Sequence, residues 1–266
     1  MTPTWQAYSS RLVGRGGEFD RLRRLLEGME RTTTGRMALV HGEAGVGKSR
    51  LVREATAVAR RAGISVFAGR AVPSGDAYRP LAEALSVALR GRPLPREDGL
   101  RPYLPALSAL LPDAGIEGRS EPSGGVILGE AILRLVTALA GPHGAMLVLE
   151  DLHWADPDTL DVLSYLADAA TTSPVVLVAT ARDELDPPQR LLDLARACQA
   201  DVIPLDRLGP EDVRGVVESC LSAAPPDELV RFVIEHADGL PFLVEELLTG
   251  LAEPVVLAGL IGRAHV

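Results

Sequence analysis

The stretch VHGEAGVGKSR, residues Val40–Arg50, decides the fold that we predict for this chain. It contains Lys48, the sole lysine among the 27 lysine and arginine residues of the 266-residue sequence. Residues 42–49 fit the pattern G-x-x-x-x-G-K-[ST] of the phosphate-binding P-loop. A lysine ammonium is a compact charge that reaches phosphate oxygens inside a ring of backbone amides, where the planar guanidinium of arginine is too wide. This requirement explains why a chain that otherwise uses arginine has a lysine here.

The residues on either side of this loop support the same interpretation. The apolar run 36–41 predicts a strand covered on both faces, and a helical pattern follows from 48 to 61. The loop glycines would let the backbone turn its amides inward, and the helix amino terminus adds positive potential. The alternative is a glycine-rich turn with an exposed lysine. Nucleotide contacts are expected from Gly42, Glu43, Ala44, Gly45, Val46, Gly47, Lys48, Ser49 and Arg50, with the Ser49 hydroxyl on Mg²⁺.

The rest of the chain alternates between strand and helix patterns. Apolar runs predict five strands, at 36–41, 63–70, 145–151, 173–184 and 200–205. Helices are expected between them, including two at 79–90 and 100–112, and three short amphipathic helices follow residue 205. Strands separated by helices form a parallel sheet with helices on both faces. We therefore expect an α/β P-loop NTPase domain at 1–206, a helical lid at 207–253 and an apolar tail at 254–266 that would begin a downstream domain.

Bulk composition narrows the possible functions. The net charge of −9 and the pI of about 5.1 argue against a broad basic surface that grips DNA or RNA. Residues 1–15 lack the apolar centre of a signal peptide, and no apolar run approaches the roughly 18 to 20 residues that span a bilayer. Cys198 and Cys220 match no metal-binding spacing. We expect a cytoplasmic protein in which this segment binds neither nucleic acid nor membrane directly.

Two acidic residues, Glu150 and Asp151, end the third predicted strand. In an open parallel sheet, ligands bind beyond the carboxyl ends of the strands. Together with an upstream P-loop, Glu150 is expected to hold Mg²⁺, usually through water, and Asp151 to orient or deprotonate the attacking water. Acids after a strand also occur for purely structural reasons, which is the alternative.

Thr180 and Arg182 end the fourth predicted strand and would face the γ-phosphate. Arg182 is a candidate to stabilise the charge that develops in the transition state, or to sense the γ-phosphate. The alternative is a surface ion pair between Arg182 and Asp183. The predicted catalytic residues are Lys48, Glu150, Asp151 and Arg182.

Five segments, taken together, carry a resemblance to a known family. They are LVGRGGEFDRL (12–22), GEAGVGKSRLV (42–52), LVLEDLHWAD (147–156), VATARDE (178–184) and DGLPFLVEELL (238–248). The set resembles the AAA-like ATPase module of STAND-type regulators, and most of all the ATPase regions of large bacterial LuxR-type transcriptional regulators. The P-loop is generic, whereas VGR (13–15), DLHWAD (151–156) and GLPFLVEELL (239–248) are much more specific to this group, and the resemblance covers about residues 10 to 252.

This resemblance implies a nucleotide, ATP or ADP with Mg²⁺, held between a five-stranded core and a helical lid. Val13, Gly14 and Arg15 would lie near the adenine, Pro241 would pack near the base, and Arg182 would sense the γ-phosphate. Such proteins act as switches with slow hydrolysis, in which ADP holds a closed form and ATP with an inducer permits self-association. Regulatory proteins or further copies are therefore the expected partners. Glu150 is one methylene longer than the aspartate that many relatives have.

Other functions are compatible with the same residues. The chain could be an AAA-like ATPase that remodels a partner or loads onto DNA, which would require an arginine supplied by a neighbouring copy. It could also be a protein-interaction scaffold that nucleotide merely stabilises. A small-molecule kinase is less favoured, because the sequence shows no acceptor site.

Overall fold

The computed structural model describes residues 9–116, 124–183, 188–221 and 224–251, so the predicted tail at 254–266 lies outside the described residues. Within these ranges the chain divides into two compact units. One unit, formed by residues 19–41 and 52–204, contains most of the sheet. The other, formed by 9–18, 42–51 and 205–251, contains the P-loop and the carboxyl-terminal helices. The domain boundary predicted at 206 stays a prediction.

The sheet has five parallel strands, as predicted, and their order is β2-β3-β4-β1-β5. The strands are β1 (Met37–Gly42), β2 (Ser65–Arg70), β3 (Ala145–Glu150), β4 (Val175–Arg182) and β5 (Asp201–Leu205). In the register, Arg70 stands opposite Glu150, and Leu149 opposite Ala179. Because neighbouring strands run in the same direction, the carboxyl ends of β2, β3 and β4 lie along one edge of the sheet.

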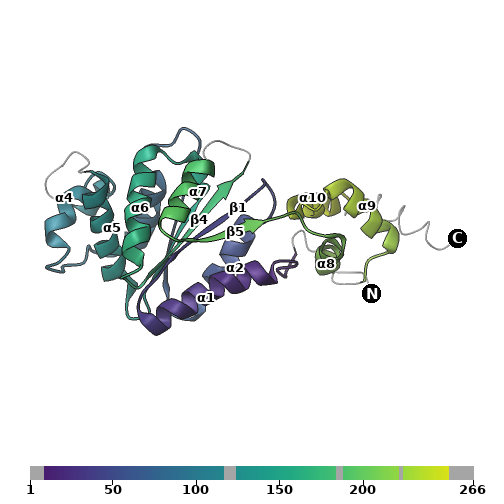
Figure 1. The fold of residues 1–266 in the computed structure, drawn as a ribbon, viewed down its shortest axis with the longest axis horizontal. Helices are drawn as coiled ribbons and strands as arrows, with labels where there is room; N and C mark the ends of the chain where they lie inside the picture. Colours follow the sequence, from purple (N-terminus) through teal and green to yellow (C-terminus); the bar gives the residue numbers. More distant parts are fainter. Residues whose placement is uncertain (1–8, 117–123, 184–187, 222–223, 252–266) are drawn as a thin grey trace. The chain divides into compact units, whose positions relative to one another are not determined.

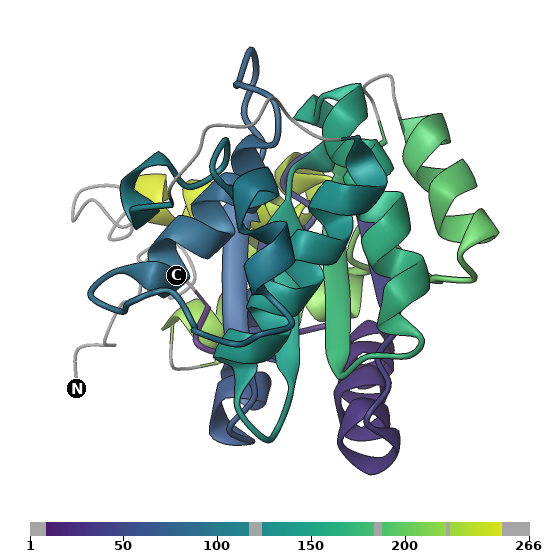
Figure 2. The ribbon, with the colours of Figure 1, turned by 90° about the vertical axis from the view of Figure 1, so that its left-hand side faces the viewer.

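Helices cover both faces of this sheet (Figures 1 and 2). One face carries α3 (Arg79–Leu89), α5 (Gly125–Ala140), α6 (Pro157–Ala170) and α7 (Pro188–Ala197). The other face carries α1 (Gly16–Thr32) and residues 52–61 of α2 (Lys48–Arg61). Leu147 and Leu177 belong to the core that includes α3, α5, α6 and α7. The next residue of each strand, Val148 or Val178, is equally buried. Burial of both faces explains why the central strands are apolar throughout rather than alternating.

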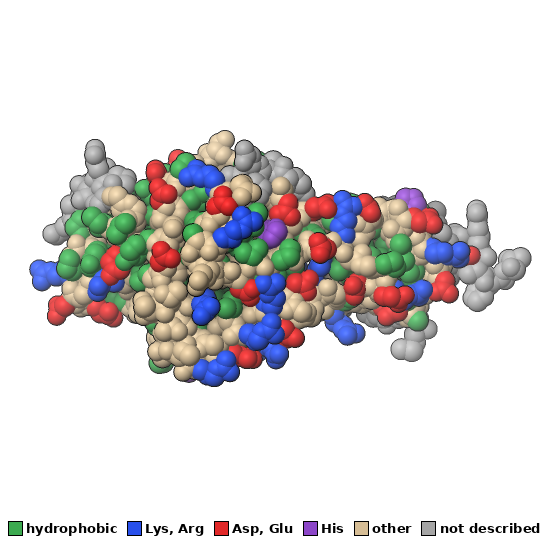
Figure 3. Space-filling model, viewed as in Figure 1, with side chains coloured by type: hydrophobic (Ala, Val, Ile, Leu, Met, Phe, Trp, Pro, Cys, Tyr) green, Lys and Arg blue, Asp and Glu red, His purple; other side chains and the backbone are tan. Residues whose placement is uncertain are grey.

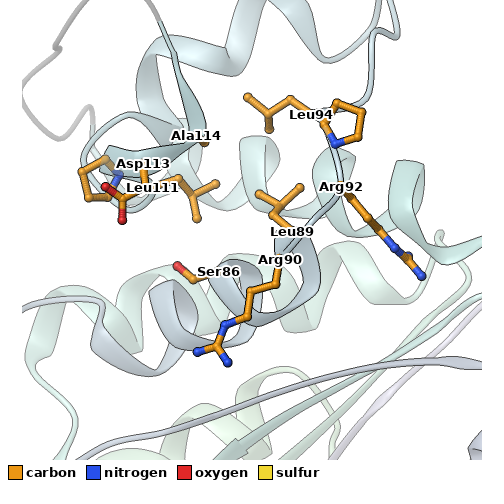
Figure 4. A pocket seen from close by; sticks show the side chains of 10 residues that line it. Ser86, Leu89, Arg90, Arg92, Leu94, Leu111, Asp113 and Ala114 are labelled. Carbon is orange, nitrogen blue, oxygen red and sulfur yellow. The ribbon is translucent and has the colours of Figure 1, made fainter.

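The segment between α3 and α5 differs from the prediction. A continuous helix was expected at 100–112, but the chain forms η1 (Arg101–Tyr103), α4 (Leu104–Leu107) and η2 (Pro112–Ala114). Prolines at 102, 105 and 112 each lack an amide hydrogen, and each lies at the first or second position of one of these short pieces. A hollow of about 390 Å³ lies beside this segment and the end of α3, between Leu89, Leu94 and Leu111 (Figure 4). None of the predicted site residues lines it.

A short turn joins the end of β3 to α6. Asp156 caps α6 by accepting a hydrogen bond from the amide of Thr159 at 2.8 Å, and Pro157 occupies the first helical position. The second oxygen of Asp156 accepts from the amide of Tyr78 at 3.2 Å. The chain that follows β2 is therefore attached to the turn that follows β3 within the same unit.

The second unit is built on a separate small core. Its helices are α8 (Pro210–Leu221), α9 (Asp227–Ala237) and α10 (Pro241–Leu251), and their buried faces meet around Val217, Val233 and Val244. Val13 packs against this core from the amino-terminal segment, with a side-chain carbon 2.9 Å from where a Cβ on Gly215 would lie. The helices, the P-loop and the residues before α1 thus belong to one compact body.

Candidate functional site

The P-loop connects the carboxyl end of β1 to the first residue of α2. Gly45 and Gly47 have φ angles of +77° and +105°, in the region that favours glycine over every other residue. The amide of Leu51 donates to the carbonyl of Gly47 at 3.0 Å, so the first turn of the helix begins at the loop. The free amides of a helix amino terminus attract anions. A glycine-rich turn that leads directly into such a terminus fits a phosphate.

Lys48 lies within this loop rather than at its surface. Its side chain is 7% exposed, and Nζ donates to the carbonyl oxygens of Gly42 and Glu43, each at 2.7 Å. The alternative of an exposed lysine in a glycine-rich turn is therefore wrong. A buried ammonium framed by loop backbone is suited to meet phosphate oxygens, because the surrounding protein screens it less than water would.

The acidic residue of the P-loop, Glu43, is held by an arginine from beyond β5. Its two carboxylate oxygens accept from Nε and Nη2 of Arg207, at 2.9 and 2.6 Å. These hydrogen bonds lower the pKa of Glu43, with smaller contributions from the charges of Arg207 and Lys48. The third nitrogen of Arg207 pairs with Asp238 in the turn before α10, and the two partners raise the pKa of Arg207.

The start of α10 lies on the P-loop within this unit. The amide of Phe242 donates to the carbonyl of Gly45 at 3.3 Å, and a Cβ built on Gly45 would lie 3.1 Å from Cβ of Phe242. Pro241, the predicted base contact, stands 3.8 Å from the equivalent position on Gly47. Glycine is thus required at 45 both for its backbone angle and for this close approach.

The residues of the predicted adenine turn have clear structural partners. Arg15 is 5% exposed, and its Nη2 donates to the carbonyls of Val46 in the P-loop and Asp206 after β5. Gly14 has φ +67°, and a side chain there would meet Asp212 and Leu208. This turn therefore fastens the P-loop to the residues that lead into α8.

A second connection starts from the other end of the P-loop. Arg50 donates to the carbonyl of Ser9 at 2.6 Å, and the amide of Ser9 donates to Glu245 in α10 at 3.0 Å. The hydroxyl of Ser9 also bonds Ser219 of α8. The side chains of Glu43 and Arg50, both predicted to contact nucleotide, thus bind other parts of the same unit.

Glu150, the last residue of β3, and Asp151, which follows it, belong to the sheet unit. Asp151 has φ 58° and ψ 37°, an uncommon conformation for a residue with a side chain. Its amide donates to the hydroxyl of Thr180 in β4 at 2.9 Å. Glu150 and Asp151 are both partly buried, with side chains 22% and 19% exposed. Strained backbone held by a neighbouring strand is frequent at functional sites.

Arg70, at the end of β2, contacts both acids. Its Nη2 lies 3.1 Å from Oε2 of Glu150, and its Nε lies 3.4 Å from Oδ2 of Asp151. The register that places Arg70 beside Glu150 explains this meeting. Sequence reasoning missed Arg70, although its position at the end of a predicted strand was a usable signal.

Arg182 is not paired with its neighbour Asp183. Asp183 instead pairs with Nδ1 of His41, from β1, at 2.8 Å. Across the described ranges, no carboxylate forms an ion pair with Arg182. Among the described residues, the structure therefore shows no surface pair between Arg182 and Asp183, and the role of Arg182 at the γ-phosphate stays a prediction.

The donor atoms present suit a hard cation. Within the sheet unit, Glu150 and Asp151 offer carboxylate oxygens, which Mg²⁺ prefers, and Mg²⁺ commonly uses one or two carboxylates together with phosphate and water. Among the residues that the structure describes, no group of three or more His, Cys, Asp and Glu side chains could hold a metal by itself. The residues fit a cation that arrives with a polyphosphate.

Fold and P-loop together define a P-loop nucleotide-binding ATPase of the α/β class. The sequence matches the AAA ATPase domain family over residues 11–178, and the chain belongs to that family. An uncharacterized protein of Rhizobium meliloti (strain 1021) is 26% identical over 268 residues, covering 92% of this chain. The chain spans only 25% of that relative's length.

Solved structures share the fold at low identity. Cdc6p from Pyrobaculum aerophilum superposes with a TM-score of 0.59 at 17% identity, covering 97% of this chain and 65% of that one. DnaA from Aquifex aeolicus, bound to AMPPCP, gives 0.53 at 12% identity, with 92% and 63% covered. A STAND protein with a tetratricopeptide repeat sensor from Pyrococcus horikoshii gives 0.50 at 18%, with 90% and 30% covered.

No helix within the described ranges has the length and apolar character needed to cross a membrane.

Proposed function

We propose that this chain is an ATP-binding regulatory switch module with slow ATP hydrolysis, of the STAND type and from or related to a LuxR-type transcriptional regulator. The observation that carries the proposal is the hydrogen bond from the amide of Phe242 to the carbonyl of Gly45. It joins the first turn of a lid helix to the phosphate-binding loop itself. A change in the P-loop when nucleotide binds would therefore be transmitted directly to α10, which is what a switch requires.

The proposed chemistry assigns one task to each predicted residue. Lys48 and the P-loop amides hold the β- and γ-phosphates, and Ser49 and Glu150 provide oxygens for Mg²⁺, which would neutralise phosphate charge. Asp151 orients or deprotonates a water that attacks the γ-phosphorus, and the bond to the β–γ bridging oxygen breaks to give ADP and phosphate. Arg182 stabilises the charge on the transferred group. The adenine would be surrounded by Val13, Gly14, Arg15 and Pro241.

Slow hydrolysis is proposed because Arg70 neutralises Glu150 and Asp151. A carboxylate oxygen that faces a guanidinium at 3.1 to 3.4 Å is less accessible to a cation or to a water molecule than an unpaired one. Rapid turnover would first require that Arg70 move away from these acids. A nucleotide state that persists in this way suits a regulator better than a motor.

The test is nucleotide binding by wild type, Lys48→Ala and Lys48→Arg, measured by calorimetry with ATP, ADP and GTP, with and without Mg²⁺. We expect Lys48→Ala to weaken ATP binding by roughly a hundredfold, as loss of a buried charge contact implies. Lys48→Arg should bind ATP nearly as poorly, because the planar guanidinium is too wide for the space inside the P-loop. Equal binding by all three proteins would refute the proposal.

An AAA-like ATPase that remodels a partner or loads onto DNA is the second candidate. It is favoured by the fold shared with Cdc6p and with DnaA. On the face seen in Figure 3, arginines alternate with acidic side chains instead of forming one broad basic area, which favours the switch. Oligomers that form with ATP and hydrolyse it faster on DNA would support this second function.

The third candidate is a protein-interaction scaffold that nucleotide merely stabilises. Rapid hydrolysis by isolated monomers would exclude it.

A further inference from the structure

The P-loop of this chain contains an acidic residue where a polyphosphate is expected. Glu43 follows Gly42 directly, and a carboxylate there would repel a bound phosphate unless another cation compensated its charge. The ammonium of Lys48 donates to the backbone carbonyl of Glu43, and its charge is the smallest of the effects that favour the carboxylate of Glu43. The compensating cation is Arg207, which bonds both carboxylate oxygens.

Arg207 bonds two acids from different parts of the unit. Its Nε and Nη2 face Glu43, and its Nη1 faces Asp238. Asp238 ends α9 with φ 46° and ψ 38°, three residues before α10 begins. The backbone supports the same arrangement, since the amide of Leu208 donates to the carbonyl of Gly239 at 2.8 Å.

We propose that Glu43 and Arg207 are positioning residues that hold the start of α10 against the P-loop and thereby slow the release of bound nucleotide. Glu43 is then an attachment point for the lid and not a ligand of phosphate. Lid movement that frees the nucleotide must break the bridge Glu43–Arg207–Asp238. This inference rests on the proposed function, since it deepens the role of the lid as the moving part of the switch.

An exposed ion pair by itself contributes little, so the bridge needs a matched comparison. The chain offers one in Arg214 and Asp227, 3.0 Å apart between α8 and α9. Their side chains are 38% and 79% exposed, against 41% and 76% for Arg207 and Asp238. The two arginines differ in that only Arg207 also reaches the P-loop.

The experiment measures the release of a fluorescent ADP by stopped flow from the full chain. The proteins are wild type, Arg207→Gln, Glu43→Gln, the double variant and the control Arg214→Gln. We expect Arg207→Gln and Glu43→Gln each to release ADP about threefold faster, as loss of one bidentate surface pair implies, and the double variant no faster than either. Raising the salt from about 50 mM to about 500 mM should narrow the difference from wild type.

A release rate for Arg207→Gln equal to that of Arg214→Gln would overturn the inference. So would effects of the two single variants that simply multiply in the double variant. If wild type binds no ADP, the proposed function fails, and hydrogen exchange at the amide of Phe242 without nucleotide tests the bridge alone. That exchange should quicken about threefold in Arg207→Gln and Glu43→Gln and stay unchanged in Arg214→Gln. Unchanged exchange in all of them would overturn the bridge independently.

Discussion

Arg70 and Glu150 stand opposite each other at the ends of adjacent parallel strands, with Nη2 of Arg70 3.1 Å from Oε2 of Glu150. The same guanidinium reaches Asp151 through Nε at 3.4 Å. One cation therefore serves both acids that we assign to Mg²⁺ and water. If Mg²⁺ binds these oxygens as proposed, Arg70 and Mg²⁺ would compete for them.

Removal of this competitor should strengthen the response to Mg²⁺. In Arg70→Ala we expect the Mg²⁺ concentration that half-saturates ATP-dependent thermal stabilisation to fall by roughly threefold, the equivalent of a modest ion pair. The control is Arg134→Ala, because Arg134 pairs with Glu130 at similar exposure, 42% and 20% against 51% and 22%. An unchanged Mg²⁺ midpoint in Arg70→Ala would show that Arg70 does not compete.

Arg15 is the most buried arginine among the described residues, at 5% exposure, and it joins the P-loop to the residues beyond β5 through the carbonyls of Val46 and Asp206. Arg15→Ala leaves both carbonyls without this donor, so we expect a loss of about 2 to 4 kcal/mol in the free energy of unfolding. Urea denaturation measures it. Arg24→Ala, at an exposed position of α1, the helix that begins directly after Arg15, should change stability by less than about 0.5 kcal/mol. Equal effects of the two variants would mean that Arg15 does not fasten the loop.

The features of this protein that could be predicted from the sequence are those that depend on residues close together in the chain. The P-loop is a contiguous pattern, and the strands are apolar runs whose burial on both faces leaves a signal in each strand separately. Glu150 and Asp151 could be placed because they end such a strand. The prediction of one helix at 100–112 was wrong because it relied on the helical spacing of the leucines. In the structure the prolines divide this segment into three short pieces.

The pairings that escaped prediction join residues that are distant in sequence. Glu43 and Arg207 are separated by 164 positions, and Arg70 and Glu150 by 80. The pairing of Arg70 with Glu150 follows from the strand order, and that of Glu43 with Arg207 from the path of the chain after β5. No local sequence pattern indicates the strand order or this path. Strand ends do carry a general signal, since the end residues of adjacent parallel strands share one edge. Applied to β2, that rule would have placed Arg70 beside the acids.

Gly47 tests whether backbone conformation alone shapes the P-loop. A Cβ there would meet nothing closer than 3.8 Å, so the cost of Gly47→Ala comes from its φ of +105° and not from a clash. We expect a loss of roughly 1 to 2 kcal/mol in unfolding free energy and a weakening of ATP binding of about tenfold. Gly17→Ala in α1, with open space around it, should be neutral or stabilising. Normal ATP binding by Gly47→Ala would show that the loop tolerates a different backbone path.

The pH dependence of the Glu43–Arg207 pair follows from the lowered pKa of Glu43. The hydrogen bonds from Arg207 favour the carboxylate, so the folded-state pKa lies below the ordinary 4.5. The stabilisation is therefore complete above that ordinary pKa and is lost as the pH falls through the lowered folded-state value.

Urea denaturation of wild type and Glu43→Gln between about pH 7 and about pH 3 measures this stabilisation. The difference in unfolding free energy should stay constant from neutral pH down to 4.5 and shrink below it. In an Arg207→Gln background the pH dependence of this difference should become much smaller, because only the minor effect of Lys48 then favours the carboxylate. A difference that grows on acidification would contradict the pairing, since a protonated Glu43 cannot hold Arg207 more tightly than an ionised one.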